Sequence, residues 1–201
     1  SRLLLDVGVL NAGFGFWPQR QDGVTPDIIS VTEQSTNMVF RAAPAYGSNR
    51  HGMHDYKAAL SYVTGSHAFK IGMDFQNGFR RNLVAINGDM TLQLNNGIPV
   101  QVTVFNTPRR TEEHLDVLMG VFVQDQWTLK RLTVNGGLRF DRLRASVPPL
   151  HLGAGTFVPE RDFAGLSGVP DWKDASPRIG AAYDLFGNGK SALKVTVSRY
   201  V

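Results

Sequence analysis

Alternation of apolar and polar residues is the feature that most limits how this chain can fold. In "AFKIGMDFQ", residues 68–76, small or polar residues alternate with Phe69, Ile71, Met73 and Phe75. Successive side chains of a β-strand point to opposite faces, so this period of two predicts a strand with one apolar and one polar face. No segment of the sequence keeps a helical period. We therefore expect an all-β fold of antiparallel strands.

The same alternation returns in other parts of the chain. In "LTVNGGLRFD", residues 132–141, Leu138 belongs to the apolar set and Asn135 to the polar set. In the run that starts at Leu115, we expect Leu115 to share a face with Val117 and the alternate residues that follow. Hairpins are expected at 89–106 and around "GNGK", because Gly and Asn between alternating runs favour tight turns. Alternating runs also start at residues 3, 56, 179 and 193, and "ISVTEQSTNMVFRA" is expected to hold a short strand pair.

The connections between these runs alternate in length. Very short turns are expected at 64–67, 129–131 and 187–190, and long links at 17–53, 78–114 and 145–177. Outer-membrane β-barrels sort their connections in this way, with short periplasmic turns and long extracellular loops. Tilted strands of about 9–11 residues would cross the membrane. Trp127, Tyr183 and Phe186 are then expected in the aromatic belt at the membrane interface.

Composition narrows the function classes. The chain of 201 residues is 42% hydrophobic and 19% charged, which is too apolar for a disordered segment. It has no cysteine, so disulfides and thiolate metal sites are excluded. The net charge of +4 is scattered rather than clustered, so we expect no nucleic-acid partner.

Two alternatives to this barrel remain open at this point. A soluble β-sandwich packed on one face would also alternate. The sorted loops, together with Gly72, Gly137 and Gly180 on the polar face, favour the barrel. A simple outer-membrane channel or adhesion barrel is the second alternative.

Several strings carry a family resemblance. "FVQDQW", "GLRFD", "SPRIGAAYDLFGNGK" and "SRY" occur in order, after "SYVTGSHAFKIGMDF". Together they resemble TonB-dependent outer-membrane receptors, most closely the subgroup with a carboxypeptidase-regulatory-like N-terminal domain. The resemblance covers most of residues 54–201 and is weaker over the first 50. It implies a plugged barrel of about 22 strands, located in the bacterial outer membrane, which imports a scarce ligand with energy from the TonB complex.

The resemblance also sets expectations for domains and partners. Residues 1–201 are expected to form part of one barrel domain, with roughly seven to nine strands. We expect the plug domain, the signal peptide and the closing C-terminal strands to lie outside this sequence. The implied partners are membrane lipid and lipopolysaccharide, the TonB complex through the plug region, and an unknown small ligand. Arg80-Arg81 and Arg109-Arg110 are candidate contacts for lipopolysaccharide at the outer rim.

The sequence predicts no enzyme, no metal and no cofactor. "GNGKS" has Asp184 where a phosphate-binding loop needs its first glycine. His51 and His54 form an H-x-x-H in an expected loop, but a metal site needs a third ligand and a rigid frame. The remaining histidines are expected to be isolated: His67, His114 and His151.

Five residues are candidates for ligand contact. Arg139 and Asp141 are like-facing neighbours on one strand, and we expect them to join a charge network in the lumen, with ligand contact as a second possibility. Trp17, Tyr46 and Trp172 are expected in the long loops, where aromatic side chains bind ligands or pack the loops together.

Overall fold

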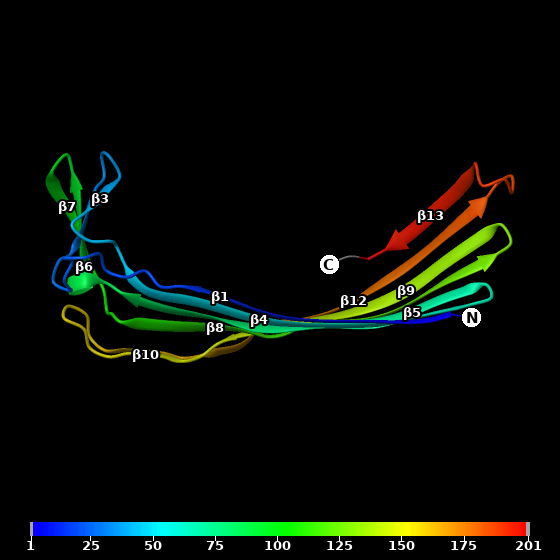
Figure 1. The fold of residues 1–201 in the computed structure, drawn as a ribbon, viewed down its shortest axis with the longest axis horizontal. Helices are drawn as coiled ribbons and strands as arrows, with labels where there is room; N and C mark the ends of the chain where they lie inside the picture. The colour runs from blue at the N-terminus through cyan, green and yellow to red at the C-terminus, as the bar shows by residue number, and fades with distance from the viewer. Residues whose placement is uncertain (1, 200–201) are drawn as a thin grey trace.

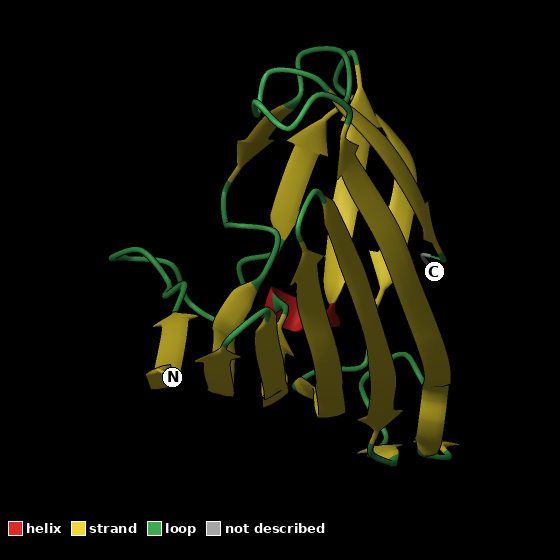
Figure 2. Cartoon of the chain, turned by 90° about the vertical axis from the view of Figure 1, so that its right-hand side faces the viewer, coloured by secondary structure: helices red, strands yellow, loops and turns green. Residues whose placement is uncertain are grey.

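The computed structural model describes residues 2–199, and its main element is a sheet of seven antiparallel strands. The strands lie side by side as a curved, open wall, in the order β1-β4-β5-β8-β9-β12-β13 (Figures 1 and 2). The expected all-β, antiparallel fold class is confirmed. The wall strands are β1 (Arg2–Phe16), β4 (Tyr46–Thr64), β5 (His67–Ala85), β8 (Arg109–Leu129), β9 (Leu132–Val147), β12 (Leu166–Asp184) and β13 (Ala192–Ser198).

The sorting of connections by length is also confirmed. Residues 65–66, 130–131 and 185–191 connect strands at one end of the wall, and residues 17–45, 86–108 and 148–165 connect them at the other (Figure 1). A positive φ of 53° at Gly65 and of 52° at Lys130 lets the two shortest turns reverse the chain. The alternating run that starts at residue 193 lies in a strand that ends at Ser198, and Tyr200 and Val201 lie outside the described residues.

The wall strands other than β13 are longer than expected. β1 has 15 residues and β8 has 21, against the 9–11 or so that cross a membrane. The added length lies at the loop end, where β4 and β5 pair without a break from Tyr46 opposite Ala85 to Thr64 opposite His67. The alternation of apolar and polar residues is lost there because water can solvate both faces of the sheet. Pairing between the strands still satisfies the backbone hydrogen bonds. The sequence therefore assigned the ends of these strands to loops.

A β-bulge in β8 overturns one expected face. Leu115 lies opposite Gly78 and Ala145, but the next register partner on β8 is Val117, opposite Arg144. The extra residue, Asp116, places Leu115 and Val117 on opposite faces. Their expected alignment was wrong, because a bulge shifts the period of two without leaving a mark in the hydrophobic pattern.

A second sheet stands at the loop end of the wall. It contains β2 (Ser30–Glu33), β3 (Met38–Phe40), β6 (Met90–Asn95) and β7 (Ile98–Val104), in the order β3-β2-β6-β7. The expected hairpin at 89–106 and the expected strand pair near residue 30 both form here (Figure 1). β2 and β6 pair in parallel, unlike every neighbouring pair in the wall. A separate hairpin joins β10 (Leu150–Leu152) to β11 (Arg161–Phe163).

The buried core lies at this loop end and not in the wall. Among residues 2–199, the buried hydrophobic side chains are Val31, Ala42, Tyr46, Leu152 and Val158. The wall is a single layer, so many of its large apolar side chains remain exposed. No helix of the described chain is long and apolar enough to span a membrane, the one short helix being η1 (Asn87–Asp89). We refer to the second sheet, the β10–β11 hairpin and the loops around them as the outer cap.

Asn87 holds two loops of the outer cap together. Its side chain is 2% exposed. Its Nδ2 donates to the carbonyl oxygens of Thr25 and Ile28, at 3.0 and 2.9 Å, and its Oδ1 accepts from Arg20 Nε at 2.8 Å. A buried amide with all these groups paired fixes the loop after β1 against the loop after β5.

Glu33, at the end of β2, joins two turns of the outer cap. Its carboxylate accepts hydrogen bonds from the backbone of Ser35, Asn96 and Gly97, and from the Ser35 hydroxyl. These donors stabilise the ionised carboxylate and lower the pKa of Glu33 to about 2, with the Ser35 hydroxyl as the largest cause. The carboxylate is therefore charged at any physiological pH.

Candidate ligand-binding face and outer cleft

One face of the wall is apolar across six of its strands. Cross-strand register places Leu5, Leu60, Ile71, Val123 and Leu138 in a single row, which ends at Pro177 on β12. All five of these side chains are exposed. An apolar surface of this extent is unusual for a soluble monomer, whereas lipid would cover it. This register confirms which residues were predicted to share a face in β4, β5 and β9.

Aromatic side chains gather on the apolar face near the short turns. The His67 ring lies parallel to the rings of Phe69 and Trp127, with centroids 5.1 and 5.5 Å away. His67 Nδ1 also lies 2.7 Å from an Asp125 carboxylate oxygen. The expectation that His67 is isolated was therefore wrong. Tyr183, at the end of β12, lies on the same face opposite Leu132 and Leu193.

The opposite face of the wall is polar and is organised around Arg139. Its guanidinium lies 3.0 Å from Asp74 on β5 and 2.7 Å from Asp141 on its own strand. Because β8 lies between β5 and β9, the arginine side chain must cross a whole strand to reach Asp74. The charge network predicted for Arg139 and Asp141 therefore forms, and it includes a carboxylate from a distant part of the sequence.

Gly120 makes the crossing possible. It lies directly between Asp74 and Asp141 in the register of β5, β8 and β9. A Cβ atom at this position would stand only 1.9 Å from Arg139 Nη2. Glycine therefore provides a notch in which the guanidinium lies flat against β8. Gly72 provides a similar notch that the Phe122 ring fills, since a Cβ there would stand 2.6 Å from the ring.

The polar face continues across the remaining strands as a row of charges. Asp174 on β12 lies opposite Asp141, and it accepts hydrogen bonds from the Ser176 hydroxyl at 3.0 Å and from Arg199 at 3.0 Å. On β4, Lys57 lies 3.2 Å from Asp55. The acidic and basic side chains of this face can bind polar groups from a ligand or from a second domain.

The aromatic candidates do not converge. Trp17 follows β1 and stacks near Arg50, while Trp172 lies within β12 rather than in a loop, and four wall strands separate β1 from β12. Both tryptophans are exposed. Tyr46 is buried, and its hydroxyl donates to Gln21 Oε1 and accepts from the Ala43 amide. This arrangement of Tyr46 favours loop packing, the alternative that the sequence left open.

The histidines differ from the sequence expectations in two ways. His51 and His54 lie on β4 rather than in a loop, and residues three apart on a strand face opposite sides, so they do not share a metal. His114 and His151 are not isolated. His114 Nε2 lies 3.0 Å from Glu112, and His151 Nδ1 lies 2.8 Å from Asp162.

A cleft of about 790 Å³ opens between the wall and the outer cap. Ser30 from the second sheet, Arg109 from β8, and Arg161 and Phe163 from the hairpin line it. No aspartate or glutamate of residues 2–199 lines this cleft, and neither arginine has an ion-pair partner there. The Ser30 hydroxyl is buried and has no hydrogen-bond partner within the described chain. Sequence analysis missed this site because its lining comes from segments that are far apart in the sequence.

The two faces and the sorted connections define a wall of a membrane β-barrel. The chain belongs to the outer membrane beta barrel domain family, which it matches over residues 7–197, and it is an outer-membrane protein. It is also similar to the TonB-dependent transporter Oar of Myxococcus xanthus, with 30% identity over 168 residues. That match covers 79% of this chain but only 14% of the relative, so the chain spans a small part of that protein's length.

Proposed function

We propose that this chain forms part of the barrel of a TonB-dependent receptor, which takes up a scarce ligand and does not catalyse a reaction. The outer cleft carries the proposal, because its volume of about 790 Å³ falls within the range of small-molecule sites. The similarity to a TonB-dependent transporter supports the energy-coupled class. The motif strings further favour the subgroup with a carboxypeptidase-regulatory-like N-terminal domain.

The polar face suggests how the rest of such a receptor would be arranged. We propose a complete barrel of about 22 strands, in which a plug domain contacts the charged row around Arg139. The TonB complex would act through that plug. At the outer rim, Arg80 and Arg81 pair with Glu113 and Glu112, so Arg110 is proposed to contact the part of lipopolysaccharide that extends above the lipid surface.

The main rival is an open outer-membrane channel, and conductance separates the two. A receptor whose lumen is plugged should pass almost no ion current when the intact protein is placed in a planar bilayer with potassium chloride on both sides. The same protein without its plug should conduct. A steady current through the intact protein would contradict the receptor proposal and favour a channel.

The chemistry of the cleft favours an anionic ligand. Arg109 and Arg161 place two unpaired positive charges beside hydroxyl groups in a cleft without carboxylates. Arginine binds carboxylates and phosphates through paired hydrogen bonds. We therefore expect a ligand with at least one carboxylate or phosphate group. Arg139, Asp141, Trp17 and Trp172 are proposed as later contacts along its path, and Tyr46 as a residue that shapes the loop.

Citrate is a suitable probe of the cleft, since it presents three carboxylates. We expect the intact, detergent-folded protein to bind citrate more tightly than the neutral sugar glucose, with an affinity that falls as salt rises. Calorimetric titration measures both. The double variant R109Q/R161Q should lose this preference, and R80Q, which changes an arginine outside the cleft, should keep it. Equal citrate binding by the two variants would contradict an anionic site in this cleft.

A further inference from the structure

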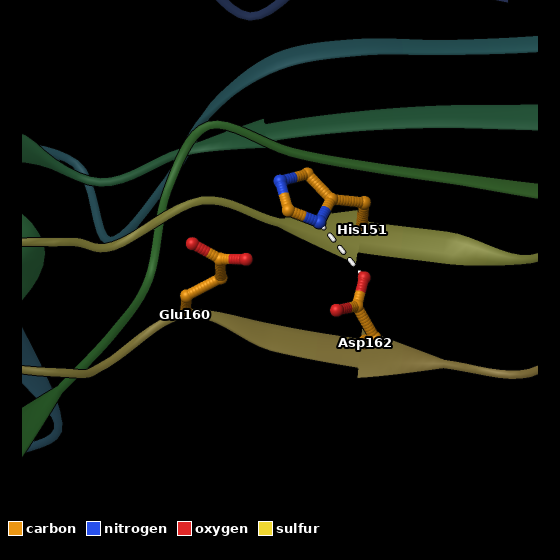
Figure 3. Close-up of side chains that lie close together, drawn as sticks. All are labelled: His151, Glu160 and Asp162. Atoms are coloured by element: carbon orange, nitrogen blue, oxygen red, sulfur yellow. Dashed lines mark hydrogen bonds and ion pairs between the residues drawn. The ribbon is translucent and has the colours of Figure 1, made fainter.

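The β10–β11 hairpin has a second face that the cleft does not use. Leu150, Leu152, Arg161 and Phe163 line the cleft. His151 and Asp162 are register partners that lie between these residues in the two strands, so they point to the opposite side. Figure 3 shows His151, Glu160 and Asp162 gathered on this face of the hairpin. This group of three side chains is termed the hairpin triad.

The hairpin triad brings one imidazole and two carboxylates together. His151 Nδ1 lies 2.8 Å from Asp162 Oδ1. One ligand atom from each of the three residues can be chosen so that all lie within 4.8 Å of one another. All three side chains are exposed, so an ion could reach them from solution. The other His–carboxylate pairs of the described chain lack such a third donor.

The backbone around the hairpin triad is held in place by the neighbouring loop. Asn106 Nδ2 donates to the Gly153 carbonyl at 2.7 Å and to the Pro159 carbonyl at 3.5 Å, one on each side of the hairpin. Within the hairpin, the Gly155 amide donates to the Val158 carbonyl at 2.9 Å. Because the backbone that carries the three side chains is already held in place, it loses less conformational freedom when an ion binds, which favours binding.

We propose that the hairpin triad binds a divalent transition-metal ion, with Zn²⁺ as the best-matched probe. Imidazole nitrogen and carboxylate oxygen are ordinary zinc ligands at about 2.0–2.2 Å. Two such atoms around a tetrahedral ion stand roughly 3.3 Å apart, so His151 and Asp162 need only a small separation to admit one. Glu160 would supply the third protein ligand, and water would complete the coordination shell. Calcium and magnesium prefer sites made wholly of oxygen ligands.

The test measures Zn²⁺ binding to the intact, detergent-folded protein by competition with a fluorescent chelator. We expect H151A and E160Q each to weaken the tightest Zn²⁺ site at least about tenfold, the lower end of what a lost outer-shell partner costs a metal site. E160Q is informative because it retains the His151–Asp162 contact and therefore the hairpin. H114A is the matched control, since it removes a histidine that has only a single carboxylate partner.

Zn²⁺ affinity that is unchanged in both H151A and E160Q would overturn the proposal. So would equal weakening by H114A, because that would indicate scattered surface binding. Tighter binding of Ca²⁺ than of Zn²⁺ would overturn the choice of metal. The readout does not involve the transported ligand, so the result stands independently of the receptor proposal.

Discussion

We expect the substitution L138R to block assembly of the barrel in the outer membrane. Leu138 is half exposed on the apolar face, between Val123 on β8 and Pro177 on β12. It lies within the apolar run of β9, which extends from Leu132 to Phe140. An arginine facing lipid near the membrane midplane costs about 2–4 kcal/mol. Heat-modifiable mobility on a gel measures the folded fraction directly.

The matched control is N135R, in the same strand with the same new side chain. Asn135 lies on the polar face opposite Gln126 and Gly180, and it is exposed. An arginine there keeps its hydration, so the barrel should assemble nearly as well as the unmodified protein. Equal damage from both substitutions would mean that β9 is buried on both faces. Damage from N135R alone would mean that the assigned faces are reversed.

The second large effect is expected in the outer cap, from N87L. Leucine has the branched shape of asparagine but makes none of its three hydrogen bonds. The Thr25 and Ile28 carbonyls and Arg20 therefore lose a buried partner. A buried group left unpaired costs about 1–3 kcal/mol. The loop after β1 should therefore open, and trypsin should cleave it at Arg20 or Arg41 much faster than before.

Barrel assembly should survive N87L, because the substitution leaves the apolar face of the wall untouched. Gel mobility of the folded barrel should therefore stay normal while proteolysis accelerates. N95L makes the same chemical change at an exposed position at the end of β6 and should leave the cleavage rate unchanged. If N87L and N95L are cleaved at the same rate, Asn87 does not hold the loop.

The parts of the fold that sequence analysis predicted are those where one face of a strand meets lipid. Phe69, Ile71, Met73 and Phe75 show their alternation plainly, because any polar residue among them would face the membrane. Beyond the membrane, at the loop end of the wall, neither face of a strand has to be apolar. Residues 46–53 and 78–85 therefore form paired strand with no regular pattern, and sequence analysis assigned them to loops.

The candidate sites were predictable only where their residues are neighbours in the sequence. Arg139 and Asp141 are two residues apart, and their pairing was expected, but Asp74 joins them through a register that no local pattern specifies. The same limit explains the hairpin triad. His151 and Asp162 are 11 residues apart and meet only because β10 and β11 pair, and these strands of three residues are too short to show alternation.

The extra length of the wall strands determines the electrostatic surroundings of the cleft. From Phe75, at the upper edge of the apolar face, β5 continues to Ala85 at the base of the outer cap. At about 3.3 Å per residue and a tilt of about 35–45°, this stretch lifts the cap roughly 25 Å above the lipid. The field of exposed charges decays over about 8 Å in physiological salt. An anion approaching Arg109 and Arg161 would therefore stand about three screening lengths from the negative membrane surface, and would be attracted by the cleft before the membrane repels it.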